Sequence, residues 1–293
     1  PLRAIAVYVP LFPRAVSVVA GLFGGPRRRA PVRFAGRGAA VLRLSSRGGR
    51  MAAAARGLGA QSLSTGLQLT MFDSASVCDV GALCCIGPLV GVLHAAGVGD
   101  SGLLCGLTAS EVCWLYGTKA VGAGCVRCAA ATTLLETHIL WSSVGAGLGN
   151  VGQGSYAAGN ACLDAQALSC RAHGVESCCL QWPLVGGAGM GASAYAALAE
   201  RRLAMVGMAG ISLEEYAACL GSQLAACCGV RLSVQVAHRS DGRELLSELA
   251  EPSQARFGEL RSAIATHTNA VSTSALVHIA GVAVADGLGP LAP

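Results

Sequence analysis

Short apolar, β-branched segments alternate with longer helix-like segments along most of this chain of 293 residues. Strands that alternate with helices favour a parallel sheet covered by helices on both faces. The sequence therefore predicts an α/β fold with a doubly wound parallel sheet in a three-layer α/β/α arrangement. The strand-like segments are Val16–Ala20, Ala39–Leu44, Met71–Cys78, Leu89–His94, His138–Trp141, Glu176–Gln181 and Arg231–Ala237. The helix-like segments are Pro26–Gly36, Thr108–Leu135, Ser155–His173 and Leu213–Cys228.

The composition allows one large domain or two small ones, and either could bury a substantial core. We interpret residues 1–15 as an irregular N-terminal segment, residues 16–248 as the α/β domain, and residues 249–293 as a C-terminal linker or tail. No apolar run reaches the roughly 18 residues that a membrane span requires without a charge or several Gly breaks. We therefore expect no membrane partner.

The charge is unevenly distributed along the chain. Residues 1–72 contain eleven Arg and no Asp or Glu, although the whole chain has a formal net charge of only +5. An Arg-rich, acid-free N-terminus is typical of transit peptides and of nucleic-acid-binding arms. Because two strand-like segments lie inside this region, we favour a folded basic region that binds no nucleic acid. We expect a cytoplasmic protein, or a plastid one if the N-terminus is a transit segment.

The fourteen Cys residues do not form the pattern of a disulfide framework. Most lie inside apolar strand-like or helix-like runs, and a chain of this length does not need disulfides as staples. Cys125 and Cys128 form a lone C-x-x-C in a helix-like segment, with no second pair or His at zinc-like spacing. We interpret the cysteines as small apolar residues in a reducing compartment, and we expect no metal site.

Four polar residues, Lys119, Ser143, Tyr156 and Asn160, point to carbonyl chemistry. Lys119 is the only lysine in the chain, and Tyr156 and Asn160 lie four residues apart, on one face of a helix. A free tyrosine has a pKa near 10, and a nearby ammonium group makes a tyrosine a better proton donor at neutral pH. A serine hydroxyl can hold a carbonyl oxygen. The alternatives are a core tyrosine, a surface lysine, a strand-end serine and a solvent-facing asparagine.

These residues and the segments around them resemble the ketoreductase domain of modular polyketide synthases, within the short-chain dehydrogenase/reductase superfamily. The resemblance covers about Ser17 to His238 and is most specific around Tyr156. It implies a Rossmann-like fold and a ketoreductase domain over residues 16–248. It also implies the roles of the four residues: Tyr156 is the acid, Lys119 its cation, Ser143 the carbonyl ligand, and Asn160 the holder of a water relay.

The resemblance implies NADPH as the cofactor. Glycines after the first strand would approach the pyrophosphate, a Ser-Arg pair after the second strand would bind the 2′-phosphate, and residues after the third and fourth strands would line the adenine and the nicotinamide. The implied cofactor residues are Gly21, Gly24, Gly25, Ser46, Arg47, Asp79, Val80, Ala96 and Gly97. For Arg47, the alternative is a surface arginine in a basic segment.

The implied activity is reduction of a β-ketoacyl thioester to a β-hydroxyacyl thioester. The implied partners are an acyl carrier protein, which brings the acyl chain on its phosphopantetheine arm, and other polyketide synthase domains. Trp182 would border the acyl-thioester groove, and its alternative is core packing.

Two other functions remain open. Arg27 stands where the family has a glycine in the phosphate-binding turn, so one alternative is a non-catalytic, structural ketoreductase-like domain. The other is a free-standing reductase of small ketones.

Overall fold

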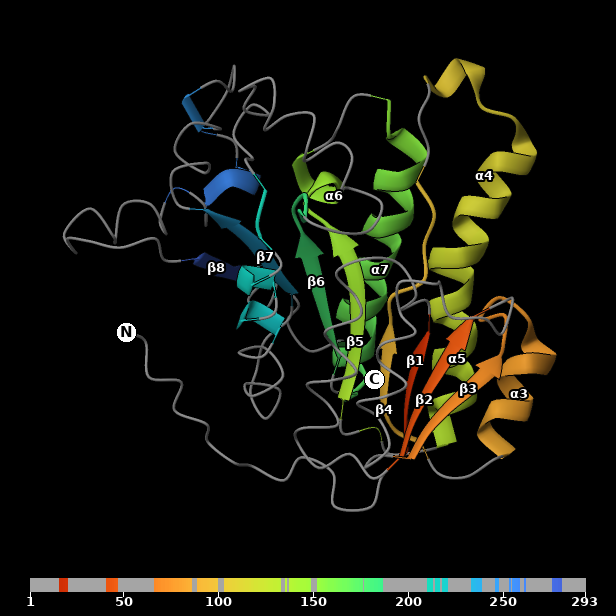
Figure 1. Ribbon diagram of the computed structural model, residues 1–293. Coiled ribbons are helices and arrows are strands. Elements are labelled where there is room, and N and C mark those ends of the chain that lie inside the picture. The colour runs from red at the N-terminus through yellow and green to blue at the C-terminus, as the bar shows by residue number, and fades with distance from the viewer. Residues whose placement is uncertain are drawn as a thin grey trace, which may run out of the picture.

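The structure is a computed structural model of the chain (Figure 1). The residues that it describes are 16–20, 41–46, 66–85, 89–99, 103–132, 135, 137–148, 152–175, 177–186, 210–212, 214–216, 218–220, 233–238, 246–247, 253, 255–258, 261 and 276–280.

One eight-stranded sheet organises the described residues, in the order β3-β2-β1-β4-β5-β6-β7-β8. Every neighbouring pair is parallel except β7 and β8. The strands are β1 (Val16–Ala20), β2 (Val41–Ser46), β3 (Gly66–Met71), β4 (Leu89–His94), β5 (Thr137–Ser143), β6 (Cys178–Trp182), β7 (Ser233–His238) and β8 (Leu276–Ala280).

The strand order reverses between β1 and β4. The chain runs from β1 outward to β3 and then returns to place β4 against the other side of β1. In open parallel sheets, ligands bind beyond the carboxyl ends of the strands at such a switch point. The predicted Rossmann-like, doubly wound α/β fold is confirmed.

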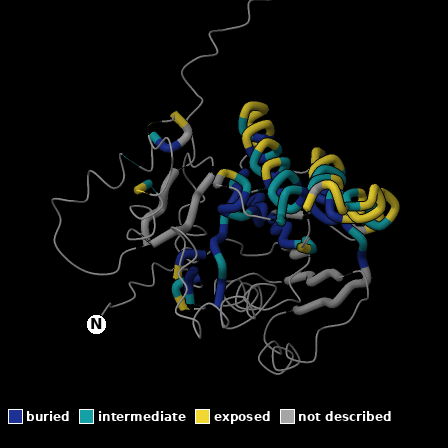
Figure 2. The backbone as a smooth tube through the Cα atoms, turned by 90° about the horizontal axis from the view of Figure 1, so that it is seen from above, coloured by how far each residue is buried: buried dark blue, intermediate teal, exposed yellow. Residues whose placement is uncertain are grey.

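The described helices include α3 (Val77–Cys85), α4 (Ala109–Tyr116), α5 (Gly122–Ala129), α6 (Gly145–Leu148) and α7 (Gly154–Ala172). Short 3₁₀ turns lie at Leu104–Gly106, Ala130–Thr132 and Ala255–Phe257. Helix α7 packs on β5 and β6 and lies beside α4 (Figure 1). The described helices are exposed on their outer sides and buried on their inner sides (Figure 2). The buried residues of α7 are Ser155, Gly159, Asn160, Leu163, Ala167 and Cys170.

The long helix predicted over residues 108–135 is interrupted. A capping box starts α4: Glu111 N–H donates to Thr108 Oγ1 (3.2 Å), and Thr108 N–H donates to Glu111 Oε2 (2.8 Å). A π-helical turn, η4 (Gly117–Val121), then separates α4 from α5. Such turns inside helices often mark functional sites, and this one contains Lys119.

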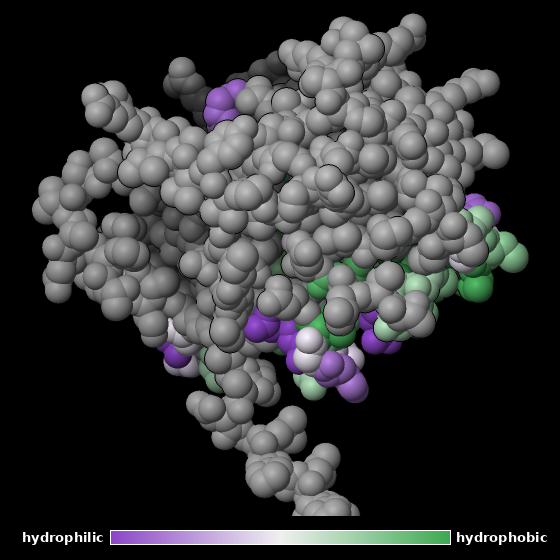
Figure 3. Space-filling model, turned by 90° about the horizontal axis from the view of Figure 1, so that it is seen from below, coloured by the Kyte–Doolittle hydropathy of each residue, from purple (hydrophilic) through white to green (hydrophobic). Residues whose placement is uncertain are grey.

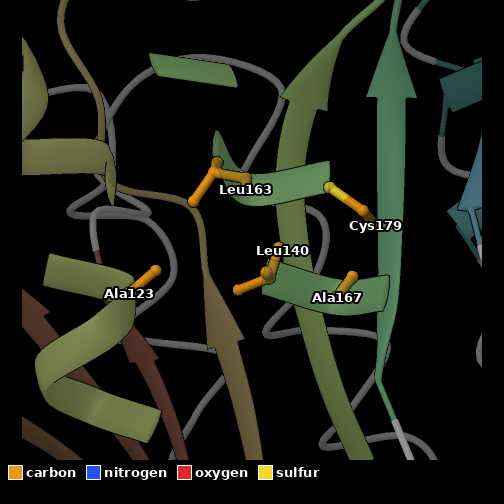
Figure 4. Packing of buried hydrophobic residues seen from close by; sticks show 5 residues of the cluster. All are labelled: Ala123, Leu140, Leu163, Ala167 and Cys179. Atoms are coloured by element: carbon orange, nitrogen blue, oxygen red, sulfur yellow. The ribbon is translucent and has the colours of Figure 1, made fainter. Parts of the chain in front are cut away.

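Two apolar clusters hold these elements to the sheet. The first lies under α7 and α5 (Figure 4), where small side chains bring the helices close to the strands. Its members are Ala123, Leu140, Leu163, Ala167 and Cys179. The second cluster joins α3 and α5 to β4 and consists of Phe72, Val80, Val92 and Val126.

The prediction for the third strand is wrong. Residues 71–78 were expected to form it, but β3 is Gly66–Met71 and Val77 already begins α3. The reason is a turn that follows the strand: Ser76 N–H donates to the Asp73 carbonyl (3.0 Å), and Ala75 N–H donates to Asp73 Oδ1 (3.0 Å). An aspartate that bonds to the backbone two residues later stabilises such turns.

The C-terminal part of the chain also contributes to the sheet. Strand β8 pairs antiparallel with β7, with Val236 opposite His278. This strand lies within residues 249–293, which the sequence analysis assigned to a linker or tail, so residues 276–280 belong to the sheet. Ser212 and Glu215 form a capping box, since Glu215 N–H donates to Ser212 Oγ (3.2 Å) and Ser212 N–H donates to Glu215 Oε2 (2.8 Å).

The surface of the described residues is mixed. Seen from below, green hydrophobic residues lie among purple hydrophilic ones (Figure 3). Trp114 and Val121, on the α4–α5 side, are about half exposed. Among the described residues, no helix is both long and apolar enough to cross a membrane.

His138 is a buried titratable residue in the middle of the sheet. It lies on β5 with 2% of its surface exposed, and its Nδ1 is 2.9 Å from Ser177 Oγ. Burial, with a smaller contribution from the positive charge of Arg127, lowers the pKa of His138 to about 4. The folded protein therefore keeps this imidazole neutral where an unfolded chain would bind a proton.

We predict that His138 makes the protein less stable in mild acid. The unfolded chain binds the proton first as the pH falls. The part of the free energy of unfolding that depends on the neutral imidazole is therefore fully present above pH about 6.5, and roughly 3 kcal/mol is lost as the pH falls toward about 4. Urea unfolding between pH 4 and 7 measures the slope. His138→Gln should flatten the slope, whereas His173→Gln, at an exposed position, should not. Equal slopes in His138→Gln and wild type would contradict this account.

Candidate functional site

The four residues singled out in the sequence come together at the carboxyl ends of the central strands. Ser143 is the last residue of β5, Tyr156 and Asn160 lie in the first half of α7, and Lys119 lies in η4 beside α7. Three separate elements thus supply four polar residues to the same end of the sheet, two of them from α7.

Lys119 is a buried cation, with only 2% of its surface exposed. Its Nζ donates a hydrogen bond to the carbonyl oxygen of Trp141 on β5 (2.9 Å) and lies 5.3 Å from the centre of the Tyr156 ring. A solvated surface lysine, the alternative in the sequence analysis, is therefore excluded.

Glycines make room for this side chain. A Cβ added at Gly97, three residues after β4, would lie 2.5 Å from Lys119 Cε and 3.1 Å from its Nζ. A Cβ at Gly159 would lie 3.7 Å from Lys119 Cβ, so α7 also passes close to the lysine stem. Gly97 thus lets the β4 loop approach the ammonium group, a requirement that the sequence pattern does not reveal.

Backbone hydrogen bonds fix the serine and asparagine. Gly145 N–H donates to Ser143 Oγ (3.2 Å), and the hydroxyl of the preceding residue, Ser142, donates to the Asn160 carbonyl (3.3 Å). Asn160 Nδ2 donates to the Tyr156 carbonyl (2.8 Å). Asn160 is fully buried, and its Oδ1 has no hydrogen-bond partner among the described residues, so it can accept a bond from a bound molecule or water.

The predicted cofactor residues are only partly described. Gly21, Gly24, Gly25 and Arg47 lie outside the described residues, and Ser46 is the last residue of β2. Half-buried Ala96 and Gly97 follow β4 at its carboxyl end, where the prediction placed them.

The residues expected to end the third strand occupy different places. Asp79 lies in the first turn of α3, where its Oδ2 accepts a bond from Asp73 N–H (2.8 Å), and Val80 is buried in the apolar core. The residue that follows β3 closely is Asp73, which the sequence analysis missed. Its position, two residues after an alternating segment from Gly66 to Met71, was a signal that could have identified it.

Trp182 is a packed residue at the end of β6, with 6% of its surface exposed. Its ring lies 4.4 Å from the ring of Tyr216, centre to centre, and the Tyr216 hydroxyl accepts a bond from Trp141 Nε1 (3.1 Å). This geometry matches the core-packing alternative, and a contact of Trp182 with a substrate stays a prediction.

The arrangement suits proton transfer to an oxygen that develops negative charge. A phenol beside a buried ammonium group can give up its proton to such an oxygen, and a neighbouring serine hydroxyl can hold that oxygen. The strand order reverses between β1 and β4, and in open parallel sheets such a reversal marks the carboxyl ends of the strands as the place where ligands bind, which is the end that carries these residues.

Comparison with known proteins agrees with carbonyl chemistry at this site. A family model described as the KR domain matches residues 15–187. The spectinabilin polyketide synthase system protein NorB of Streptomyces orinoci is 36% identical over 148 residues, which are 50% of this chain and 7% of that protein. The chain thus spans a small part of that relative's length.

Solved structures resemble the chain over most of its length. A ketoreductase from the first module of phoslactomycin biosynthesis in Streptomyces sp. HK803 is 26% identical with a TM-score of 0.72, over 85% of this chain and 58% of that one. An A1-type ketoreductase is 28% identical with a TM-score of 0.69, over 78% of this chain and 48% of that one. Together with the family match, these likenesses show that the chain belongs to the KR domain family, the ketoreductase domains of modular polyketide synthases.

Proposed function

We propose that the protein reduces a β-ketoacyl thioester to a β-hydroxyacyl thioester with NADPH, as a ketoreductase domain of a polyketide synthase. The observation that carries the proposal is the buried Lys119 ammonium group, 5.3 Å from the centre of the Tyr156 ring and hydrogen-bonded to the strand that ends in Ser143.

Each residue has a distinct task in this reaction. Ser143 holds the β-carbonyl oxygen of the substrate by a hydrogen bond, and Tyr156 transfers its hydroxyl proton to that oxygen as the carbonyl becomes a hydroxyl. Lys119 stabilises the phenolate that Tyr156 becomes. Asn160 holds a water that returns a proton to Tyr156, a role supported by its buried, available Oδ1.

Two features of the described residues support NADPH. The strand order reverses between β1 and β4, where ligands bind in open parallel sheets, and Gly97 keeps the β4 loop free of a side chain next to Lys119. NADPH, when bound, would supply the hydride to the β-carbon. Lys119 and Gly97 would border the nicotinamide ribose, Asp79 or Asp73 the adenine, and Ser46 and Arg47 the 2′-phosphate.

The partners follow from the same proposal. An acyl carrier protein would present the substrate on its phosphopantetheine arm, and other polyketide synthase domains would supply the ketone and consume the alcohol. The relatives' names support this context, because NorB is named as a polyketide synthase protein.

We predict that Tyr156→Phe strongly slows the reaction. The substitution removes only the proton donor, so turnover of a β-ketobutyryl thioester should fall by about 10²–10⁴-fold while NADPH affinity stays unchanged. NADPH consumption measures turnover, and fluorescence titration measures affinity.

The matched control is Tyr116→Phe, the same change on half-buried α4, which should keep wild-type turnover. Wild-type rates in Tyr156→Phe would contradict the proposal. Turnover of cyclohexanone but not of the thioester would support a free-standing reductase of small ketones. No turnover and no NADPH binding in the wild type would support a structural domain.

Gly97→Ala tests the space around the ammonium group. Because the new Cβ would lie 2.5 Å from Lys119 Cε, the flexible end of the lysine must move, so kcat should fall at least about tenfold. The melting temperature should change little, since no backbone atom needs to move. Gly99→Ala is the control, because nothing lies within 4 Å of its Cβ position. Equal kcat in the two variants would contradict this role of Gly97.

A further inference from the structure

Three distant segments meet closely beside the helix that follows Lys119. His94, the last residue of β4, is fully buried, and its Nε2 lies 3.4 Å from Oγ of Ser74 in the loop after β3. Two other strands separate β3 from β4 in the sheet. The third member is Gly122, the first residue of α5: a Cβ added there would lie 2.5 Å from Ser74 Oγ and 3.1 Å from His94 Nε2. We call Ser74, His94 and Gly122 the junction.

The junction continues the second apolar cluster toward the carboxyl ends of the strands. Val92 precedes the junction histidine by two residues on β4, and Val126 follows the junction glycine by four on α5. Both spacings keep side chains on one face of their element. The loop after β3 supplies one member to each group, Phe72 to the cluster and Ser74 to the junction. The contact is therefore part of the packed core, and the core fixes its position.

Gly122 also closes the π-helical turn that contains Lys119. Its N–H donates to the carbonyl oxygens of Gly117 and Lys119. Gly117 lies five residues earlier, which is the spacing that defines a π-helical turn. A Cβ at Gly122 would lie 3.2 Å from the same Gly117 oxygen. One glycine thus both ends the turn and meets the junction, so a displacement at this point moves the turn as well.

The surroundings of Lys119 leave little room for such a displacement. Its Nζ donates to the Trp141 carbonyl at 2.9 Å, and the backbone at Gly97 approaches so closely that a Cβ there would lie 2.5 Å from Lys119 Cε. A shifted turn must therefore change the hydrogen bond to Trp141 or the 5.3 Å separation of Nζ from the centre of the Tyr156 ring.

We propose that Gly122 is a positioning residue for the reaction. Its missing side chain lets the π-helical turn rest on the other two residues of the junction, and this contact fixes the Lys119 ammonium group beside Tyr156. The proposal rests on the ketoreductase function for its purpose. Its physical content, the seating of the turn, can be measured without turnover.

Two glycines of the same helix provide a test and a matched control. Gly122→Ala puts a methyl group into the junction, so kcat should fall at least about tenfold as Lys119 leaves its place. Gly124→Ala is the same change two residues later, where the nearest atom, Gln166 Nε2, lies 3.8 Å from the new Cβ. It should keep wild-type kcat. Equal kcat in the two variants overturns the proposal.

Ser74→Ala separates the junction contact from a general loss of packing. It removes the Oγ atom that lies nearest to the new methyl group, and the next atoms lie 3.1 and 3.2 Å away. The double variant Ser74→Ala/Gly122→Ala should therefore turn over at least about threefold faster than Gly122→Ala alone, as expected for residues in contact. A double variant that is no faster than Gly122→Ala contradicts the proposal.

The single lysine of the chain reports the position of the ammonium group directly. Protein grown on lysine labelled with ¹³C at Cε gives one lysine side-chain NMR signal, and the nearby Tyr156 ring makes its shift sensitive to position. Gly122→Ala should move this signal, and the double variant should return it toward its wild-type place. Gly124→Ala should leave it there. An unmoved signal in folded Gly122→Ala overturns the proposal.

A variant from the other side of the junction covers the case in which no protein changed at Gly122 folds. Ser74→Ala only removes an atom, and the opened contact should still shift the Lys119 signal. An unmoved signal in Ser74→Ala would then refute the proposal.

Turnover separates this inference from the function on which it rests. If the wild type is active and Gly122→Ala changes neither kcat nor the Lys119 signal, only the role of the junction is contradicted. If the signal moves and returns as expected in a protein that reduces no β-ketoacyl thioester, only the proposed reaction is contradicted.

Discussion

The burial of one ammonium group is the constraint around which the described site is arranged. The Lys119 ammonium group loses its hydration when the protein folds. The Trp141 carbonyl accepts a hydrogen bond from it, and Gly97 and Gly159 leave space for its side chain because they carry none. The π-helical turn that holds Lys119 departs from regular helix at this place. A buried charge is costly to fold, so its presence points to chemistry rather than to stability.

The sheet provides the frame that makes this arrangement possible. Because β4 and β5 are parallel neighbours, their carboxyl ends bring the Gly97 loop and Ser143 to the same edge. Helix α7 packs across β5 and β6 through small residues such as Ala167, which brings Tyr156 close to the strand ends. Site and core are thus continuous: the pair Leu140 and Cys179 belongs to the apolar cluster, and the pair Ser142 and Gln181 lies two residues further along the same two strands.

Much of this was predictable from local pattern, and the exceptions have physical causes. Short apolar runs identified β1 and β4, a helix-like segment identified α7, and the spacing of Tyr156 from Asn160 placed both on one helix face. The boundary between β3 and α3 was misplaced because the Asp73 turn is set by hydrogen bonds, not by hydropathy. The role of Gly97 depends on a close approach to Lys119 between distant segments, which a single sequence does not display.

Lys119→Met is the most direct test of the central claim, because methionine fills similar space without the charge. We expect turnover of a β-ketobutyryl thioester with NADPH to fall by about a hundredfold or more, while the free energy of unfolding stays equal or rises, since a buried charge has been removed. A variant that keeps wild-type turnover, or that loses both turnover and stability, would contradict the claim that this ammonium group is maintained for catalysis.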